Sequence, residues 1–331
     1  MHKVISIVFI LFFISTSCSN KQKEFKLSGE TQGTFFHITY YGEKDYSNEI
    51  DSLLTDFDLI ASIYNKNSII SKINQNDSNI KVNSTFIDIF NIGVNVSNQT
   101  NGAFDMSIGP LVNAWGFGPE EAIEPDSTTI DSLLKLINYK KIYLIDNTII
   151  KDNPNIKLDF NAIAKGYAVD LVGDFLSSKN IESYLVEIGG EIITKGHKPN
   201  GDDWIVGIEM PAETANAPQQ PQSRISVSNM AVATSGNYRN YYEQNGERFA
   251  HTINPKTGYP VQHSLLSVTV IAKTCATADA YATAFMVLGK EKALEIAEKI
   301  KNLEIYLIYY NSKTEKNETV FSSGFEKYIL D

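Results

Sequence analysis

The sequence predicts an α+β fold with mixed or antiparallel sheets and packed helices, arranged as one body or as two lobes. Segments rich in β-branched and aromatic residues are interspersed with segments whose apolar residues recur at helical spacing. These segments do not follow the strand–helix–strand rhythm of a doubly wound parallel sheet. The 331 residues include 17 Phe and 17 Tyr, which argues against a mostly disordered chain.

The first half of the chain starts with an expected strand. Residues 34–41 are rich in β-branched and aromatic side chains, so they predict a strand. Residues 50–63 and 86–96 carry apolar side chains at helical spacing, which predicts two amphipathic helices. A shorter helix is expected at 130–136, followed by a strand at 141–145.

The second half continues the mixed pattern. A helix is expected at 161–176, with Asn161 as its N-cap. Residues 211–222 are rich in Pro, Ala and Gln and predict a surface excursion. By the same residue preferences, the remaining expected strands are 184–188, 204–210, 265–272 and 305–310, and the remaining expected helices are 277–288 and 290–300.

The chain begins with the pattern of an export signal. Lys3 precedes an apolar run at 4–14 that is too short to span a bilayer. Small residues follow, and then Cys18, so residues 1–17 resemble a bacterial lipoprotein signal peptide with Cys18 as the lipidation site. The alternative is an ordinary secretory signal with an incidental cysteine. The polar segment 18–28 is expected to be a tether, and residues 29–331 to form the folded domain.

These features predict a body held at the cell envelope by a lipid anchor, facing the periplasm or the exterior. With Cys18 acylated, Cys275 has no partner for a disulfide bond. The net charge of −10, from 29 basic and 39 acidic residues, disfavours a general role in binding nucleic acid.

One candidate anion site lies at the start of the helix expected at 161–176. Asp159 precedes the helix, and Lys165 lies in its first turns. Free N–H groups at a helix N-terminus favour anions, and a lysine adds a point charge for a phosphate. Ala162 and Gly166 are small enough to let a ligand approach the backbone closely. The alternative is an ordinary capped helix with a solvated lysine.

A candidate metal site lies in the helix expected at 277–288. Asp279 and Thr283 are four residues apart, so they share one helix face, and both present oxygen. Mg²⁺ takes few protein oxygens and completes its shell with water and substrate phosphates. The alternative is a capping aspartate with a threonine bonded to its own backbone.

Two further segments carry candidate functional side chains. His251 precedes the turn at 254–258 and is a candidate base near neutral pH; a structural histidine is the alternative. Residues 102–110 mix aromatic surface with a carboxylate, which suits a flat heteroaromatic ligand or an ordinary packed loop. Ser235 is not in a G-x-S-x-G elbow, and no Walker A, G-x-G-x-x-G, H-E-x-x-H or paired C-x-x-C motif is present.

Taken together and in order, these segments resemble the ApbE family of FAD:protein FMN transferases. The resemblance covers nearly the whole chain after the tether. Its motifs, in order along the chain, are residues 31–34, Tyr64, and residues 102–105, 159–170, 187–190, 235–240, 251–260 and 277–283.

The resemblance implies an α+β enzyme with a flavin cleft that cleaves the diphosphate of FAD. FMN would pass to a Thr or Ser hydroxyl of another protein through a phosphoester, with release of AMP. The chain has no acceptor motif of its own, so the implied partner is a flavoprotein subunit of an exported or membrane-bound redox system. Cleavage by water, as an FAD pyrophosphatase, and a non-catalytic flavin-binding lipoprotein are alternatives, and a plain surface adhesin is a fourth reading.

The resemblance also assigns residue roles. Mg²⁺, with Mn²⁺ as an alternative, would be bound by Asp279, Thr283 and the backbone carbonyl of Ala162, and His251 would be the general base. Gln32 and Asn161 depart from the family's frequent Met and Ser, which places flavin-ring contacts in doubt. The residues implied to bind FAD are Gln32, Tyr64, Ala103, Phe104, Asp105, Asp159, Lys165 and Ile253.

Overall fold

A large antiparallel sheet forms the centre of the computed structural model, which describes residues 22–123, 125–210, 221–236, 241–244, 247–250 and 252–330. Its eight strands follow the order β1-β2-β5-β6-β9-β12-β13-β14, and every neighbouring pair is antiparallel. The strands are β1 Lys23–Thr31, β2 Thr34–Gly42, β5 Tyr184–Ile188, β6 Glu191–Lys195, β9 Ala231–Gly236, β12 Leu265–Ala272, β13 Glu304–Asn311 and β14 Lys316–Phe321.

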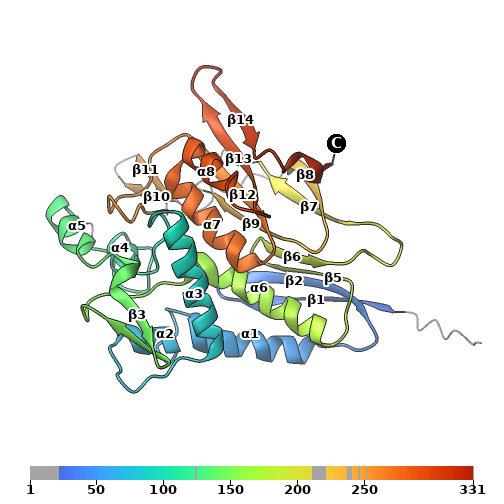
Figure 1. Cartoon of the computed structure of the whole chain (residues 1–331), viewed down its shortest axis with the longest axis horizontal. Helices are drawn as coiled ribbons and strands as arrows, with labels where there is room; N and C mark the ends of the chain where they lie inside the picture. Colours follow the sequence, from blue (N-terminus) through green and yellow to red (C-terminus); the bar gives the residue numbers. More distant parts are fainter. Residues whose placement is uncertain are drawn as a thin grey trace, which may run out of the picture.

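Helices cover one face of this sheet, as Figure 1 shows. The covering helices are α1 Ser47–Ala61, α3 Ser84–Gln99, α6 Asn161–Ser178 and α7 Cys275–Leu288, with α8 Lys290–Ala297 following α7. Their apolar side chains form the main core with the facing strand residues, among them Phe57, Phe86 and Val270. Most of the expected strands and helices are present within a few residues of their predicted bounds, and the α+β class is confirmed.

A three-stranded sheet, β15-β8-β7, packs near the opposite face of the main sheet. Its strands are β7 Trp204–Glu209, β8 Pro221–Val227 and β15 Ile329–Leu330. Val206 and Ile225 from this sheet meet Val232 and Ile271 from the main sheet in what we call the second core. Since neighbouring residues of a strand point to opposite faces, β12 contributes Val270 to the main core and Ile271 to the second core.

A peripheral region carries shorter elements. A small apolar cluster of Leu111, Ile130 and Ile253 joins two of the helices to the segment after residue 251. Within the described residues, no helix is both long and apolar enough to cross a bilayer. The elements outside the main layers are α2 Ile69–Asn74, α4 Gly109–Ala114, α5 Ser127–Leu134, β3 Ile142–Ile145, β4 Thr148–Lys151, β10 Tyr241–Gln244 and β11 Glu247–Ala250.

Two expectations about element boundaries are wrong. Residues 23–28 are not tether, because β1 pairs with β2 from Lys23 onward and packs Phe25 and Leu27 against the main core. Asn161 is not the N-cap of α6; Phe160 occupies that position, and the Asn161 N–H donates to Asp159 Oδ1 at 2.7 Å. Cys18, the signal segment and residues 211–220 of the expected surface excursion lie outside the described residues.

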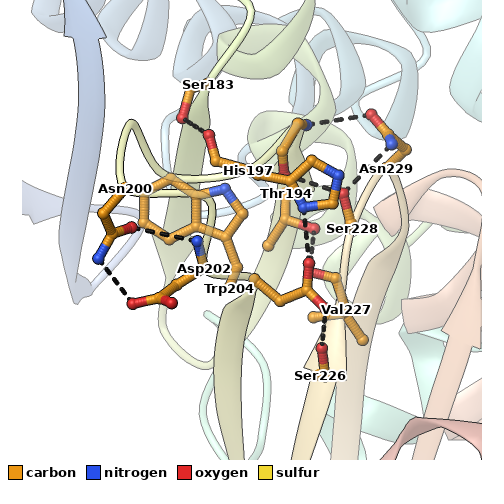
Figure 2. A network of polar contacts seen from close by, with 12 residues as sticks. Ser183, Thr194, His197, Asn200, Asp202, Trp204, Ser226, Val227, Ser228 and Asn229 are labelled. Carbon is orange, nitrogen blue, oxygen red and sulfur yellow. Dashed lines mark hydrogen bonds and ion pairs between the residues drawn. The ribbon is translucent and has the colours of Figure 1, made fainter.

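A polar network ties the β6–β7 connection to the three-stranded sheet, as Figure 2 shows. The Nδ1 atom of His197 lies 2.6 Å from Asp203 Oδ1, and the other oxygen of Asp203 accepts the Ser226 hydroxyl at 2.6 Å. Asn229 Oδ1 accepts the Gly196 N–H at 3.1 Å. The carboxylate lies between the imidazole and the hydroxyl, so this His–Asp–Ser set anchors a loop and does not activate a nucleophile.

Candidate active site

The centre of the candidate site is the junction of α6 and α7. The two helices run antiparallel, since the Gly166 N–H donates to Asp279 Oδ2 at 3.0 Å, while the Asp170 carboxylate accepts the N–H groups of Cys275 and Ala276 at 2.7 and 2.8 Å. A Cβ on Gly166 would lie 2.4 Å from the carbonyl oxygen of Cys275. Glycine is therefore required for the helices to approach this closely.

Helix spacing indicates that the three predicted metal ligands lie near one another at this junction. One helical turn before Gly166 on α6 is Ala162, and one turn after Asp279 on α7 is Thr283. The Gly166 N–H that reaches Asp279 is the one that closes on the Ala162 carbonyl in a regular helix, so the carboxylate lies beside that carbonyl. The hydroxyl of Thr283 lies 3.3 Å from that of Ser235 on β9.

These ligands fit a hard divalent cation. Carboxylate, hydroxyl and carbonyl oxygens are the donors that Mg²⁺ and Mn²⁺ accept. Asp279 is only 4% exposed, and burial raises the pKa of its carboxyl, so a nearby cation would favour the charged form. No group of three or more His, Cys, Asp and Glu side chains suited to a metal occurs among the described residues. A cation bound by Asp279, Thr283 and the Ala162 carbonyl would complete its coordination shell with water and substrate oxygens.

Lys165 lies in the same part of α6 and forms an ion pair in which the lysine is half-buried and the acid is buried. Its Nζ lies 2.6 Å from Oε1 of Glu191, the first residue of β6. Burial opposes the charge of Lys165, but the nearby Glu191 and Asp279 carboxylates outweigh it and raise the pKa of the ammonium. Lys165 therefore carries a positive charge. Glu191 was not among the predicted site residues; its only sequence signal is its position directly after Gly189-Gly190.

Asp159 lies just before α6 in the chain, and Tyr64, which follows α1, lies close enough for the charge of Asp159 to act on it. Asp159 is 6% exposed, and burial raises the pKa of its carboxyl to about 6. Tyr64 is 60% exposed and donates its hydroxyl to the Phe117 carbonyl at 3.2 Å. Burial, and next the charge of Asp159, raise the pKa of Tyr64, as expected for neighbouring groups. The Tyr64 ring borders a cavity of about 430 Å³ that Lys66 and Lys157 also line.

The 102–110 segment contacts the residues that precede α6. The Asp159 N–H donates to the Met106 carbonyl at 2.8 Å. Ala103 and Phe104 are buried, and the Asp105 carboxylate accepts hydrogen bonds from Ser107 and from the Tyr139 N–H. The structure thus uses the Asp105 side chain to shape the loop. Direct contact of Ala103, Phe104 and Asp105 with FAD stays a prediction.

The remaining predicted residues lie on two turns. Gln32 adopts φ +49° in the β1–β2 turn, and its Nε2 is buried without a hydrogen-bond partner. Ile253 is buried in the small cluster with Leu111 and forms a bridge to Pro260. His251 lies outside the described residues, so its role as general base stays a prediction.

Known proteins share this sequence and fold. A sequence model of the ApbE family matches residues 32–307. A Haemophilus influenzae protein named FAD:protein FMN transferase is 39% identical, covering 99% of this chain and 98% of its own length; a Vibrio cholerae protein of the same name is 38% identical over 85% and 86%.

Solved structures agree with the sequence relatives. The flavin transferase ApbE from Vibrio cholerae superposes with a TM-score of 0.83 at 35% identity, covering 93% of this chain and 99% of that one. The apo form of the Pseudomonas stutzeri flavinyl transferase ApbE gives a TM-score of 0.82 at 32% identity, covering 93% and 97%. The family model, the sequence relatives and the solved structures lead to one conclusion: this chain belongs to the ApbE family.

Proposed function

We propose that this protein is an FAD:protein FMN transferase that moves FMN from FAD to a Thr or Ser hydroxyl of another protein. The observation that supports the proposal is the α6–α7 junction, where the Gly166 N–H donates to Asp279 Oδ2. Helix spacing then puts Ala162 and Thr283 one turn away from this contact, each on its own helix. Lys165 supplies a half-buried positive charge on α6. The relatives named FAD:protein FMN transferase, similar over nearly the full length, support the same activity.

The residues divide the work between binding and bond exchange. Lys165 and the N-terminus of α6 attract the diphosphate. Asp279, Thr283 and the Ala162 carbonyl would hold Mg²⁺ or Mn²⁺, whose bound charge offsets the negative charge that develops on the diphosphate. Tyr64 and Asp159 would position the nucleotide.

In the proposed reaction one phosphorus–oxygen bond forms and another breaks. The acceptor oxygen forms a bond to the FMN phosphorus as the bond from that phosphorus to the AMP oxygen breaks. The proton of the acceptor hydroxyl passes to His251, and AMP leaves. Water in place of the hydroxyl would give free FMN and AMP from the same site.

The partner and the location follow from the N-terminal segment. Lipidation at Cys18 would hold the enzyme on a membrane of the cell envelope, facing the periplasm or the exterior. Acceptors would then be exported or membrane-bound redox subunits that expose a Thr or Ser to the same compartment. Labelling with a radioactive fatty acid, with Cys18→Ser as the control, tests the anchor.

A direct assay tests the transfer. Incubation with FAD, Mg²⁺ and a candidate acceptor should add the mass of one FMN to the acceptor, and a chelator should prevent this addition. Rapid release of free FMN and AMP without any acceptor would favour the hydrolase alternative. Intact FAD after prolonged incubation with Mg²⁺ and acceptors would favour a binding lipoprotein, and absence of flavin binding would leave only a structural role.

A further inference from the structure

Glu191 is a buried acid beside a site that has to bind an anion. It is 3% exposed, and its Oε1 contacts Lys165 at 2.6 Å. Taken alone, a carboxylate near a diphosphate weakens binding by repulsion. An ion pair, whether exposed or buried, also adds little stability over well-packed apolar residues. Neither anion binding nor fold stability therefore accounts for an acid at this position.

The strand geometry directs Glu191 toward the site. Ile193, two residues along β6, packs against the main core, whereas Ile192 packs against the second core. Since side chains alternate along a strand, Glu191 lies on the face covered by α6 and α7. Lys165 contacts Glu191 directly, and the charge of Asp279 also acts on Glu191, so its carboxylate lies near both the anion-binding lysine and the predicted metal ligand.

The second carboxylate oxygen of Glu191, Oε2, is buried and has no hydrogen-bond partner in the part of the chain that the structure describes. Among the described residues, the buried side-chain polar atoms without a hydrogen-bond partner are Gln32 Nε2, Glu191 Oε2 and Ser267 Oγ. Gln32 and Glu191 lie at neighbouring hairpin turns, because the Gly189 N–H donates to the Phe35 carbonyl at 2.9 Å. A buried polar atom without a partner is costly, so one free donor and one free acceptor at the same sheet end indicate a ligand that completes them.

We propose that Glu191 is a positioning residue of the transferase site: its Oε1 holds the Lys165 ammonium against the diphosphate, and its Oε2 accepts a hydrogen bond from a hydroxyl or water that arrives with the substrate. This inference rests on the proposed transferase function. It predicts that an acid strengthens the binding of an anion, which is the reverse of simple repulsion.

The test is FAD affinity, measured by fluorescence titration with Mg²⁺ present and no acceptor protein. Glu191→Gln should weaken FAD binding about tenfold to a hundredfold, because a hydrogen bond to a charged group is lost and Lys165 is released. The matched control is Glu182→Gln, which removes the charge of an acid that is 72% exposed and pairs with Lys195 at 3.3 Å. The control should bind FAD like the wild type.

A double-mutant cycle separates positioning from a structural effect. In a Lys165→Met background, Glu191→Gln should cause clearly less loss than in the wild type, because the residue through which it acts is gone. Glu191→Asp keeps the charge but shortens the reach to Lys165, so it should also weaken FAD binding. It serves as the decisive variant if Lys165→Met does not fold, as judged by thermal unfolding.

Comparison of FAD with ADP identifies the donor. A larger loss with FAD indicates a hydroxyl of the ribityl chain, and an equal loss indicates water or a hydroxyl of the adenosine ribose that both ligands carry. Unchanged or tighter FAD binding by Glu191→Gln, or the same loss in both backgrounds, would overturn the inference while leaving the transferase function intact. A wild-type protein that binds no FAD would instead contradict the transferase function, and this inference with it.

Discussion

The close contact between α6 and α7 can be broken with a single methyl group. In Gly166→Ala the new Cβ would lie 2.4 Å from the Cys275 carbonyl oxygen, 2.6 Å from its carbon and 2.8 Å from the Ala276 nitrogen. Ordinary contact begins at 3.4 Å, so the nearest atom falls about 1 Å short. All three atoms belong to the backbone, which cannot rotate away, and the helices must therefore separate.

The expected cost has a structural and a catalytic part. Overpacking of this kind costs about 1–3 kcal/mol, partly offset by about 1 kcal/mol because alanine favours a helix. A shift near 1 Å between Ala162 and Asp279 can reduce catalysis about a hundredfold. Gly166→Ala should therefore unfold at a lower urea concentration. Its rate of FMN transfer should fall about a hundredfold, while its free energy of unfolding falls only modestly.

Gly173→Ala on the same helix is the control. Its new Cβ would meet side-chain atoms of Tyr184 and Ile193 at 3.1 and 3.2 Å, which can shift by a few tenths of an ångström. Urea denaturation and FMN transfer should be measured for both variants. A Gly166→Ala protein with wild-type stability and activity would refute the argument that this contact builds the site.

Three other substitutions test the site and its support. Asp279→Asn keeps an acceptor for the Gly166 N–H but loses the charge, so transfer should fall at least about a hundredfold with little change in unfolding; near-normal transfer would exclude Asp279 as a metal ligand. Thr283→Val should raise the Mg²⁺ concentration needed for half-maximal transfer about tenfold, while Ser235→Ala, which removes only the hydroxyl 3.3 Å from Thr283, should have a smaller effect; an equal effect of both would contradict direct ligation by Thr283. Burial raises the pKa of Asp170 to about 7, above its unfolded value near 4, so the folded state binds this proton more tightly and the stability that Asp170 contributes falls as pH rises from about 4 to 7. Urea denaturation at several pH values should therefore show wild type losing stability relative to Asp170→Asn across that range, and parallel profiles would disprove this.

The sequence predicted elements with strong periodicity and missed those without it. The helix at 86–96 was expected from its apolar spacing and is found as α3, Ser84–Gln99. β1 was taken for a tether because its exposed positions are charged or polar, although Phe25 and Leu27 alternate with them toward the core. The N-cap of α6 was misplaced because the Asp159 carboxylate, not the Asn161 side chain, accepts the first free N–H.

The candidate site shows the same limit. The spacing of Asp279 and Thr283 on one helix is local, so it could be predicted from the sequence. The Lys165–Glu191 ion pair joins a helix to a strand, and no short-range pattern encodes it. Asp105 was predicted to bind FAD, and its carboxylate also accepts hydrogen bonds from Ser107 and Tyr139, a structural role that only the folded loop reveals.

The hydrogen bond between Gly166 and Asp279 spans 113 residues of chain. A ribosome releases α6 well before α7, so a nascent or clipped polypeptide that ends ahead of α7 holds only one side of the junction. Such a fragment has the lysine and the helix terminus but lacks the oxygens of α7, so we expect it not to cleave the dinucleotide. Cleavage of FAD therefore requires a chain that has been completed through α7.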